Sequence, residues 1–115
     1  MIKIKRAYEA AEKSDGMRFL VDRLWPRGIK KEDLKVEEWD KEVAPSNDLR
    51  KRFHHDPEKW DEFCRHYFEE LDKKPESWQG ILEAAKEGTV TLIYGAKDLE
   101  HNNARALKEY LEKKL

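Results

Sequence analysis

Two nearly continuous apolar runs, far apart in the chain, constrain the fold more than any other feature of the sequence. They are "MRFLVDRL" at 17–24 and "TVTLIY" at 89–94, and both contain β-branched residues. Runs without strict polar alternation predict strands that are covered on both faces, as in a parallel sheet. A third segment, "IKIKRA" at 2–7, alternates apolar and basic residues and predicts a short strand with one buried face.

Helical patterns separate the two runs. A short helix is predicted after Ser46, where Leu49 and Phe53 lie four residues apart. A longer helix is predicted to follow Asp56 as N-cap and Pro57 as first helical residue. Two further amphipathic helices are expected within 75–88 and 101–115. The stripe of the longer helix is apolar at Trp60, Phe63, Cys64, Tyr67 and Leu71.

Strands that alternate with helices require crossover connections, so the sequence predicts an α/β fold with a small, mainly parallel sheet and helices packed on it. The segment 29–46 shows one helical turn at "KKEDL" and is otherwise expected to be mostly irregular, with an extended piece before Pro45. A chain of 115 residues can bury one core. Residues 1–115 are therefore expected to form a single domain.

The charge balance argues against two classes of partner. The 24 basic and 25 acidic residues give a net charge of -1, so binding to nucleic acid is not expected. The longest uncharged run, at 88–96, is too short to cross a membrane, and the N-terminus lacks the apolar core of a secretory signal.

Cys64 is the only cysteine, which excludes an internal disulfide and a cysteine-rich metal site. We expect a cytoplasmic protein.

In parallel sheets ligands bind beyond the carboxyl ends of the strands, and two polar segments lie there. The first is "DRLWPRG" at 22–28, where Arg23 and Arg27 could grip a phosphate or carboxylate with paired hydrogen bonds. In the alternative, Asp22 neutralises the arginines and Trp25 anchors the loop in the core. The second is "YGAKDLEHNN" at 94–103, in which Asn102 or the next asparagine could cap the last helix.

Several other polar residues are candidates for the same site. Ser46 precedes a helix, where capping is favoured over anion binding. His54 and His55 are adjacent and point about 100° apart on a helix, so no metal site is expected there, and no cofactor is indicated. His54 or His101 could act as a general acid or base, but no activated nucleophile is evident and Cys64 lies on the apolar stripe.

These residues predict a protein that binds a small anionic ligand, such as a nucleotide or a phosphorylated metabolite, and that could be an enzyme. The alternative is a non-catalytic module that binds a protein or nucleic acid. The sequence predicts neither a particular oligomeric state nor a particular reaction. The predicted pocket is lined by Asp22, Arg23, Trp25, Arg27, Ser46, His54, Tyr94 and Asn102.

Three long segments resemble the domain-of-unknown-function family 488, in its short YeaO-like branch: "DGMRFLVDRLWPRGIKKEDL", "WDKEVAPSNDLRKRFHHDPEKWDEFCRHYFEEL" and "TLIYGAKDLEHNNARALKEYL". The resemblance covers essentially the whole chain. Longer members of the family tend to carry a cysteine after the last strand and a Cys-His-Arg run at the following helix. The matching positions here are Tyr94 and Asn102-Asn103-Ala104, so the thiol chemistry suggested for those relatives does not carry over, whereas a shared binding pocket does.

Overall fold

A four-stranded, wholly parallel sheet forms the centre of the molecule. A computed structural model describes residues 1–53 and 56–115. The strand order is β1-β4-β2-β3, so the chain crosses over between neighbouring strands. The predicted α/β fold with a parallel sheet is confirmed. The strands are β1 (Ile2–Arg6), β2 (Met17–Leu20), β3 (Glu38–Trp39) and β4 (Val90–Tyr94).

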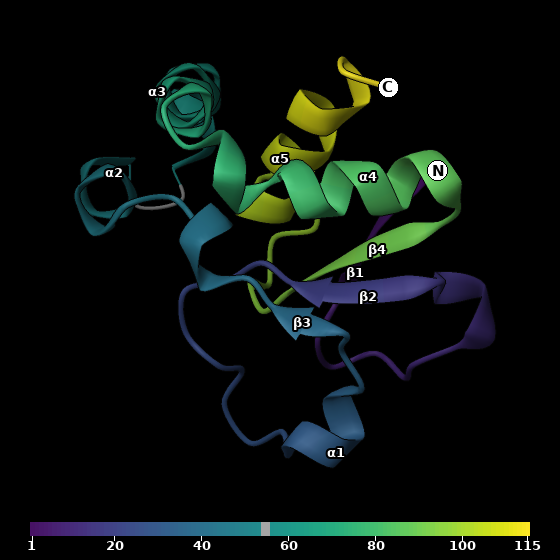
Figure 1. The fold of residues 1–115 in the computed structure, drawn as a ribbon. Helices are drawn as coiled ribbons and strands as arrows, with labels where there is room; N and C mark the ends of the chain where they lie inside the picture. The colour runs from purple at the N-terminus through teal and green to yellow at the C-terminus, as the bar shows by residue number, and fades with distance from the viewer. Residues whose placement is uncertain (54–55) are drawn as a thin grey trace.

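Helices cover the two faces of the sheet unequally. In Figure 1, α3, α4 and α5 lie above the sheet and α2 lies beside α3, whereas only α1 lies below it. The long helix predicted after Asp56 begins with a 3-10 turn, Pro57–Lys59, before it becomes α-helical. The α-helices are α1 (Lys31–Leu34), α2 (Asn47–Phe53), α3 (Trp60–Asp72), α4 (Gln79–Glu87) and α5 (Asn103–Glu112).

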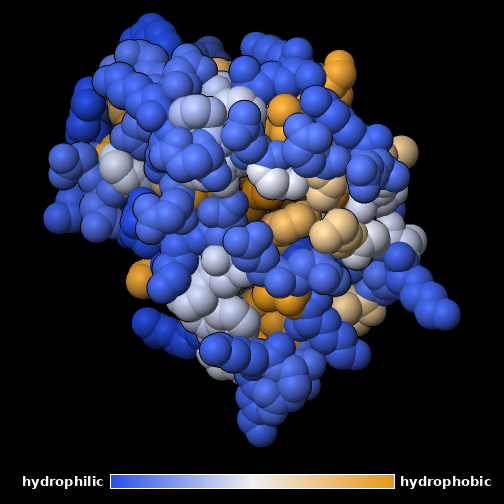
Figure 2. All heavy atoms as spheres, viewed as in Figure 1, coloured by the Kyte–Doolittle hydropathy of each residue, from blue (hydrophilic) through white to orange (hydrophobic). Residues whose placement is uncertain are grey.

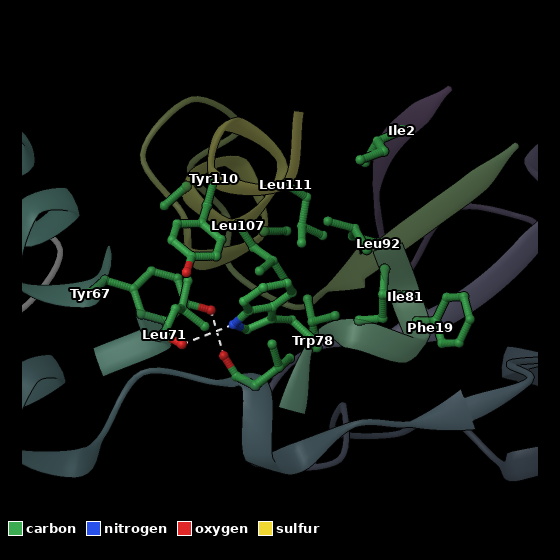
Figure 3. Close-up of a cluster of buried hydrophobic side chains, with 14 of the residues drawn as sticks. Ile2, Phe19, Tyr67, Leu71, Trp78, Ile81, Leu92, Leu107, Tyr110 and Leu111 are labelled. Atoms are coloured by element: carbon green, nitrogen blue, oxygen red, sulfur yellow. Dashed lines mark hydrogen bonds between the residues drawn. The ribbon is translucent and has the colours of Figure 1, made fainter. Parts of the chain in front are cut away.

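The larger core lies between the sheet and α3, α4 and α5 (Figure 3). Two aromatic side chains with polar groups are buried in this core, and the polar group of each donates a hydrogen bond. The Trp78 indole N–H donates to the Leu71 carbonyl at 2.9 Å, and the Tyr67 hydroxyl donates to the Val43 carbonyl. Cys64 is also buried here, and burial raises the pKa of its thiol to about 12. A thiol in that state is a poor nucleophile at neutral pH.

The opposite face of the sheet combines a small apolar cluster with an ionic network. The Arg18 guanidinium is buried and each of its three nitrogens donates a hydrogen bond. Nη1 donates to Asp15 at 2.6 Å, Nη2 to the Leu34 carbonyl at 2.8 Å, and Nε to the Lys35 carbonyl at 3.2 Å. Lys5 lies 3.1 Å from the same Asp15 carboxylate. These bonds hold α1 against the sheet.

The edge strand β3 lies in the segment 29–46, which was expected to be mostly irregular with an extended piece before Pro45. Glu38 and Trp39 form such a piece and pair in parallel with Phe19 and Leu20. Only two residues form this edge strand, which is too few to show an apolar period in the sequence. The Trp39 indole N–H donates to the Asp22 carbonyl at 2.8 Å and so ties β3 to the end of β2.

The surface is largely hydrophilic on the face shown in Figure 2, with hydrophobic areas of limited extent between the charged side chains. No helix in the part of the chain that the structure describes is long and apolar enough to span a membrane.

Candidate functional site

The two polar strand ends identified in the sequence meet at the Asp22 carboxylate. Oδ2 accepts a hydrogen bond from the Gly95 backbone N–H at 2.8 Å, and Oδ1 accepts one from the Asn103 amide at 3.0 Å. The same Asn103 amide donates to the Val21 carbonyl at 3.0 Å. A side chain at position 95 would crowd the carboxylate, because a Cβ there would lie 3.3 Å from Oδ2. Asp22 and Asn103 therefore join the ends of β2 and β4 to the start of α5.

A cavity of about 220 Å³ opens beside this junction. Its walls come from the segment after β2, the loop before α2, the end of α2, the start of α3 and the loop before α5. Such a volume is below the usual range for drug-sized ligands, so the cavity suits a small molecule. The acidic and arginine side chains that line it are Asp22, Arg23, Arg50 and Asp56, and its other polar lining residues include His101, Asn102 and Asn103.

One wall of the cavity is aromatic. Trp60 and Phe63 stack with their ring centroids 5.6 Å apart and their planes inclined by 18°. Phe53 meets Phe63 edge to face at 6.3 Å, and His101 meets Trp60 edge to face at 5.3 Å. Trp60 and Phe63 are only partly buried. Although the sequence assigned both to the helical core stripe, they line the cavity.

Arg23 has few hydrogen bonds for a side chain whose Nε is buried. Its Nη2 donates to the Ala44 carbonyl at 3.5 Å, which is the limit of a hydrogen bond. Its Nε is shielded from solvent and has no hydrogen-bond partner among the described residues. Within the same part of the chain no ion pair joins Arg23 to a carboxylate. Leaving a buried charged donor unpaired is costly, and a native structure that does so calls for an explanation.

His101 lies on the other side of the cavity and is oriented by Asp98. Its Nδ1 is 3.1 Å from an Asp98 carboxylate oxygen. The backbone N–H groups of Glu100 and His101 donate to that carboxylate and hold the pKa of Asp98 below its usual value. Asn102 caps α5, because its oxygen accepts from the Arg105 N–H at 2.8 Å. The predicted cap is confirmed, and it places Asn102 in the wall of the cavity.

Two residues of "DRLWPRG" lie elsewhere. Trp25 packs edge to face on Trp39 at 5.4 Å on the α1 side of the sheet, and its indole N–H donates to the Ile29 carbonyl at 2.6 Å. Arg27 is exposed and does not line the cavity. The two arginines therefore do not converge there. The reason is the turn at Pro26, which carries the chain from the sheet end towards Tyr8, whose hydroxyl donates to the Arg27 carbonyl.

Ser46 and Tyr94 have structural surroundings and do not line the cavity. The Ser46 hydroxyl accepts from the Leu49 N–H at 3.1 Å and donates to Glu70 at 2.6 Å, so the favoured capping role is confirmed. Tyr94 is buried in the core, and that burial raises its pKa. The candidate His54 lies outside the described residues.

The cavity also contains residues that the sequence did not indicate as site residues, chiefly Arg50 and the aromatic wall. Arg50 is exposed at its rim and lies on α2, which the sequence identified only as a short helix. No group of three His, Cys, Asp or Glu side chains among the described residues is arranged to hold a metal ion.

Comparisons with known proteins place these observations in a family context. A family described as "Inactive DUF488-N3 subclade" matches residues 1–115. The chain is 46% identical to the uncharacterized protein YeaO of Escherichia coli (strain K12) over 110 residues, 96% of each chain. It is 51% identical over 110 residues to the uncharacterized proteins Rv3073c of Mycobacterium tuberculosis and Mb3100c of Mycobacterium bovis, covering 96% of this chain and 92% of each relative. No solved structure matches the chain significantly.

Proposed function

The chain belongs to the inactive DUF488-N3 subclade, and from that premise we propose that it is a non-catalytic domain that binds a small anionic ligand in the cavity at the carboxyl end of its sheet. The description of the family argues against catalysis. The buried Cys64 agrees with this, since it is the only thiol in the chain and its pKa is about 12. We also propose a cytoplasmic location, since proteins with one unpaired cysteine suit a reducing compartment.

The observation that carries the proposal is the Nε of Arg23 in the wall of the cavity, which has no hydrogen-bond partner among the described residues. The Asp22 carboxylate accepts from Gly95 and Asn103, so its charge is already stabilised by amide donors. A carboxylate or phosphate oxygen from a ligand would supply the acceptor that Arg23 lacks. Because Nε is shielded from solvent, we expect the Arg23 side chain to turn towards the cavity when the anion binds.

Arg50 provides a second cation for the same ligand. It lies at the rim, and among the described residues it forms no ion pair. An exposed arginine increases the rate at which an anion is captured more than it increases affinity. We therefore assign the larger share of the affinity to Arg23 and the smaller share to Arg50.

The test is a calorimetric and thermal-shift screen of wild type, Arg23→Ala and Arg27→Ala. The probes are acetate, inorganic phosphate, benzoate, phenyl phosphate and a nucleoside monophosphate. Hydrogen bonds to charged groups contribute about 1.5 to 3 kcal/mol, so Arg23→Ala should weaken binding by about tenfold or more. Arg27→Ala removes the same charge from the same loop outside the cavity. It should bind like wild type.

Two results would count against this function. One is that no probe binds wild type at millimolar concentration. The other is that Arg23→Ala and Arg27→Ala weaken binding equally, since that would indicate a general effect of surface charge.

A further inference from the structure

We infer that the anion bound at Arg23 carries a planar aromatic ring, which lies against the wall formed by Phe53, Trp60 and Phe63. This inference rests on the proposed function and adds the chemical class of the ligand. Arg23 alone would select for an anion of any shape. The aromatic wall selects for what is attached to that anion.

The aromatic wall holds its rings in fixed orientations. Trp60 and Phe63 are one helical turn apart and stack on each other at 18°, and both line the cavity. Both remain partly exposed although they pack against the core. Side chains that served only the core would be covered as Tyr67 is on the same helix, with no exposed surface. Exposed aromatic area in a cavity favours stacking with a ligand ring.

The origins of the lining residues indicate how the ligand is oriented. Arg23 follows β2, whereas the aromatic residues come from the end of α2 and the start of α3. A ligand that uses both has its anionic group at the sheet end and its ring against the two helices. His101 lies beside the aromatic part of the cavity, because it contacts Trp60 edge to face and lines the same cavity.

The size and charge of the cavity limit the ligand further. A volume of about 220 Å³ corresponds to the space of roughly seven water molecules, enough for one ring system with a short acidic substituent. Asp22 and Asp56 line the cavity together with Arg23 and Arg50, so the formal charges of these four described side chains balance. A ligand with several negative groups would meet these carboxylates. The geometry therefore favours a single anionic group on the ring.

The test compares benzoate with cyclohexanecarboxylate, which share one carboxylate and a six-membered ring but differ in planarity. Calorimetry on wild type should show benzoate binding about fivefold more tightly, in line with the strength of aromatic pairs. Trp60→Leu should remove this preference, and Trp60→Phe should retain most of it. Phe68→Leu is the matched control, because Phe68 lies on α3 and packs on Tyr110 outside the cavity.

The outcomes separate this inference from the proposed function. If both carboxylates bind wild type equally and both are weakened by Arg23→Ala, the anion site stands and the inference of an aromatic ligand is overturned. If neither carboxylate binds and phenyl phosphate does not bind either, both the proposed function and this inference are overturned. The comparison of the two carboxylates uses wild-type protein, so it decides the inference even if Trp60→Leu does not fold.

Discussion

Two arginines near the same strand, Arg18 in β2 and Arg23 just after it, have opposite surroundings. The Arg18 guanidinium donates from all three nitrogens to a carboxylate and two carbonyls, and the residue is 5% exposed. Arg23 makes one bond at 3.5 Å and leaves Nε without a partner among the described residues. A closed network marks a residue that supports the fold. An open one, in the wall of a cavity, marks a residue available to a ligand.

The acids beside the two arginines show the same contrast. Asp15 is buried, which by itself raises its pKa, but hydrogen bonds from the Glu12 backbone, Lys5 and Arg18 lower the pKa below the usual value. Asp15 is therefore ionised and paired within the protein. Asp22 accepts from amide groups that join three chain segments, and among the described residues no ion pair joins Arg23 to a carboxylate.

The largest expected effect comes from breaking the closed network. Arg18→Met should lower the free energy of unfolding by about 3 kcal/mol, because it leaves the buried Asp15 and two carbonyls without their donor. Arg23→Met should change it by less than about 1 kcal/mol, since few bonds are lost. Urea unfolding of both variants measures the difference. Similar losses in the two variants would mean that Arg23 is as structural as Arg18.

A smaller effect is expected at Asp40, a carboxyl group that, unlike Asp15, has no network of cations around it in the structure's described residues. Burial and the charge of Glu38 raise the pKa of Asp40 to about 6, from a usual value of 3.8. When a carboxyl group has a higher pKa in the folded state, its ionisation destabilises the folded protein. The free energy of unfolding should therefore fall as the pH rises from about 4 to about 6.

Asp40→Asn should therefore be more stable than wild type by about 1 kcal/mol at pH 7, after allowance for solvent screening, and no more stable below about pH 4. Unfolding measured across this range checks the sign. A variant that is less stable than wild type at pH 7 would show that Asp40 belongs to a favourable network like that of Asp15.

The sequence predicted the fold well because the fold depends on long patterns. The apolar runs that form β2 and β4 and the stripe of α3 are read directly from residue spacing, and the order of elements then implies a parallel sheet. For the edge strand β3 the sequence predicted only an extended piece before Pro45, because two residues carry no period. Its position depends on pairing with β2, which is a tertiary contact.

The site was predicted only in part, because a pocket depends on side-chain direction more than on position along the chain. Asp22, Arg23, His101 and Asn102 follow from the rule that ligands gather at the carboxyl ends of parallel strands. Arg27 is exposed and does not line the cavity, because the chain turns at Pro26 between it and Arg23. Trp60 and Phe63 share the stripe of Tyr67, and spacing alone does not separate a core face from a pocket wall.

The most direct test of the contrast between Arg18 and Arg23 is a titration of the protein with benzoate, followed by NMR of the arginine Nε–Hε groups. The Arg23 signal, assigned with Arg23→Lys, should shift progressively and exchange more slowly with water as the anion binds. The Arg18 signal should be present in the free protein and should stay in place, because its three donors are already used. Binding of benzoate that leaves the Arg23 signal unmoved, or that moves both signals alike, would contradict the account.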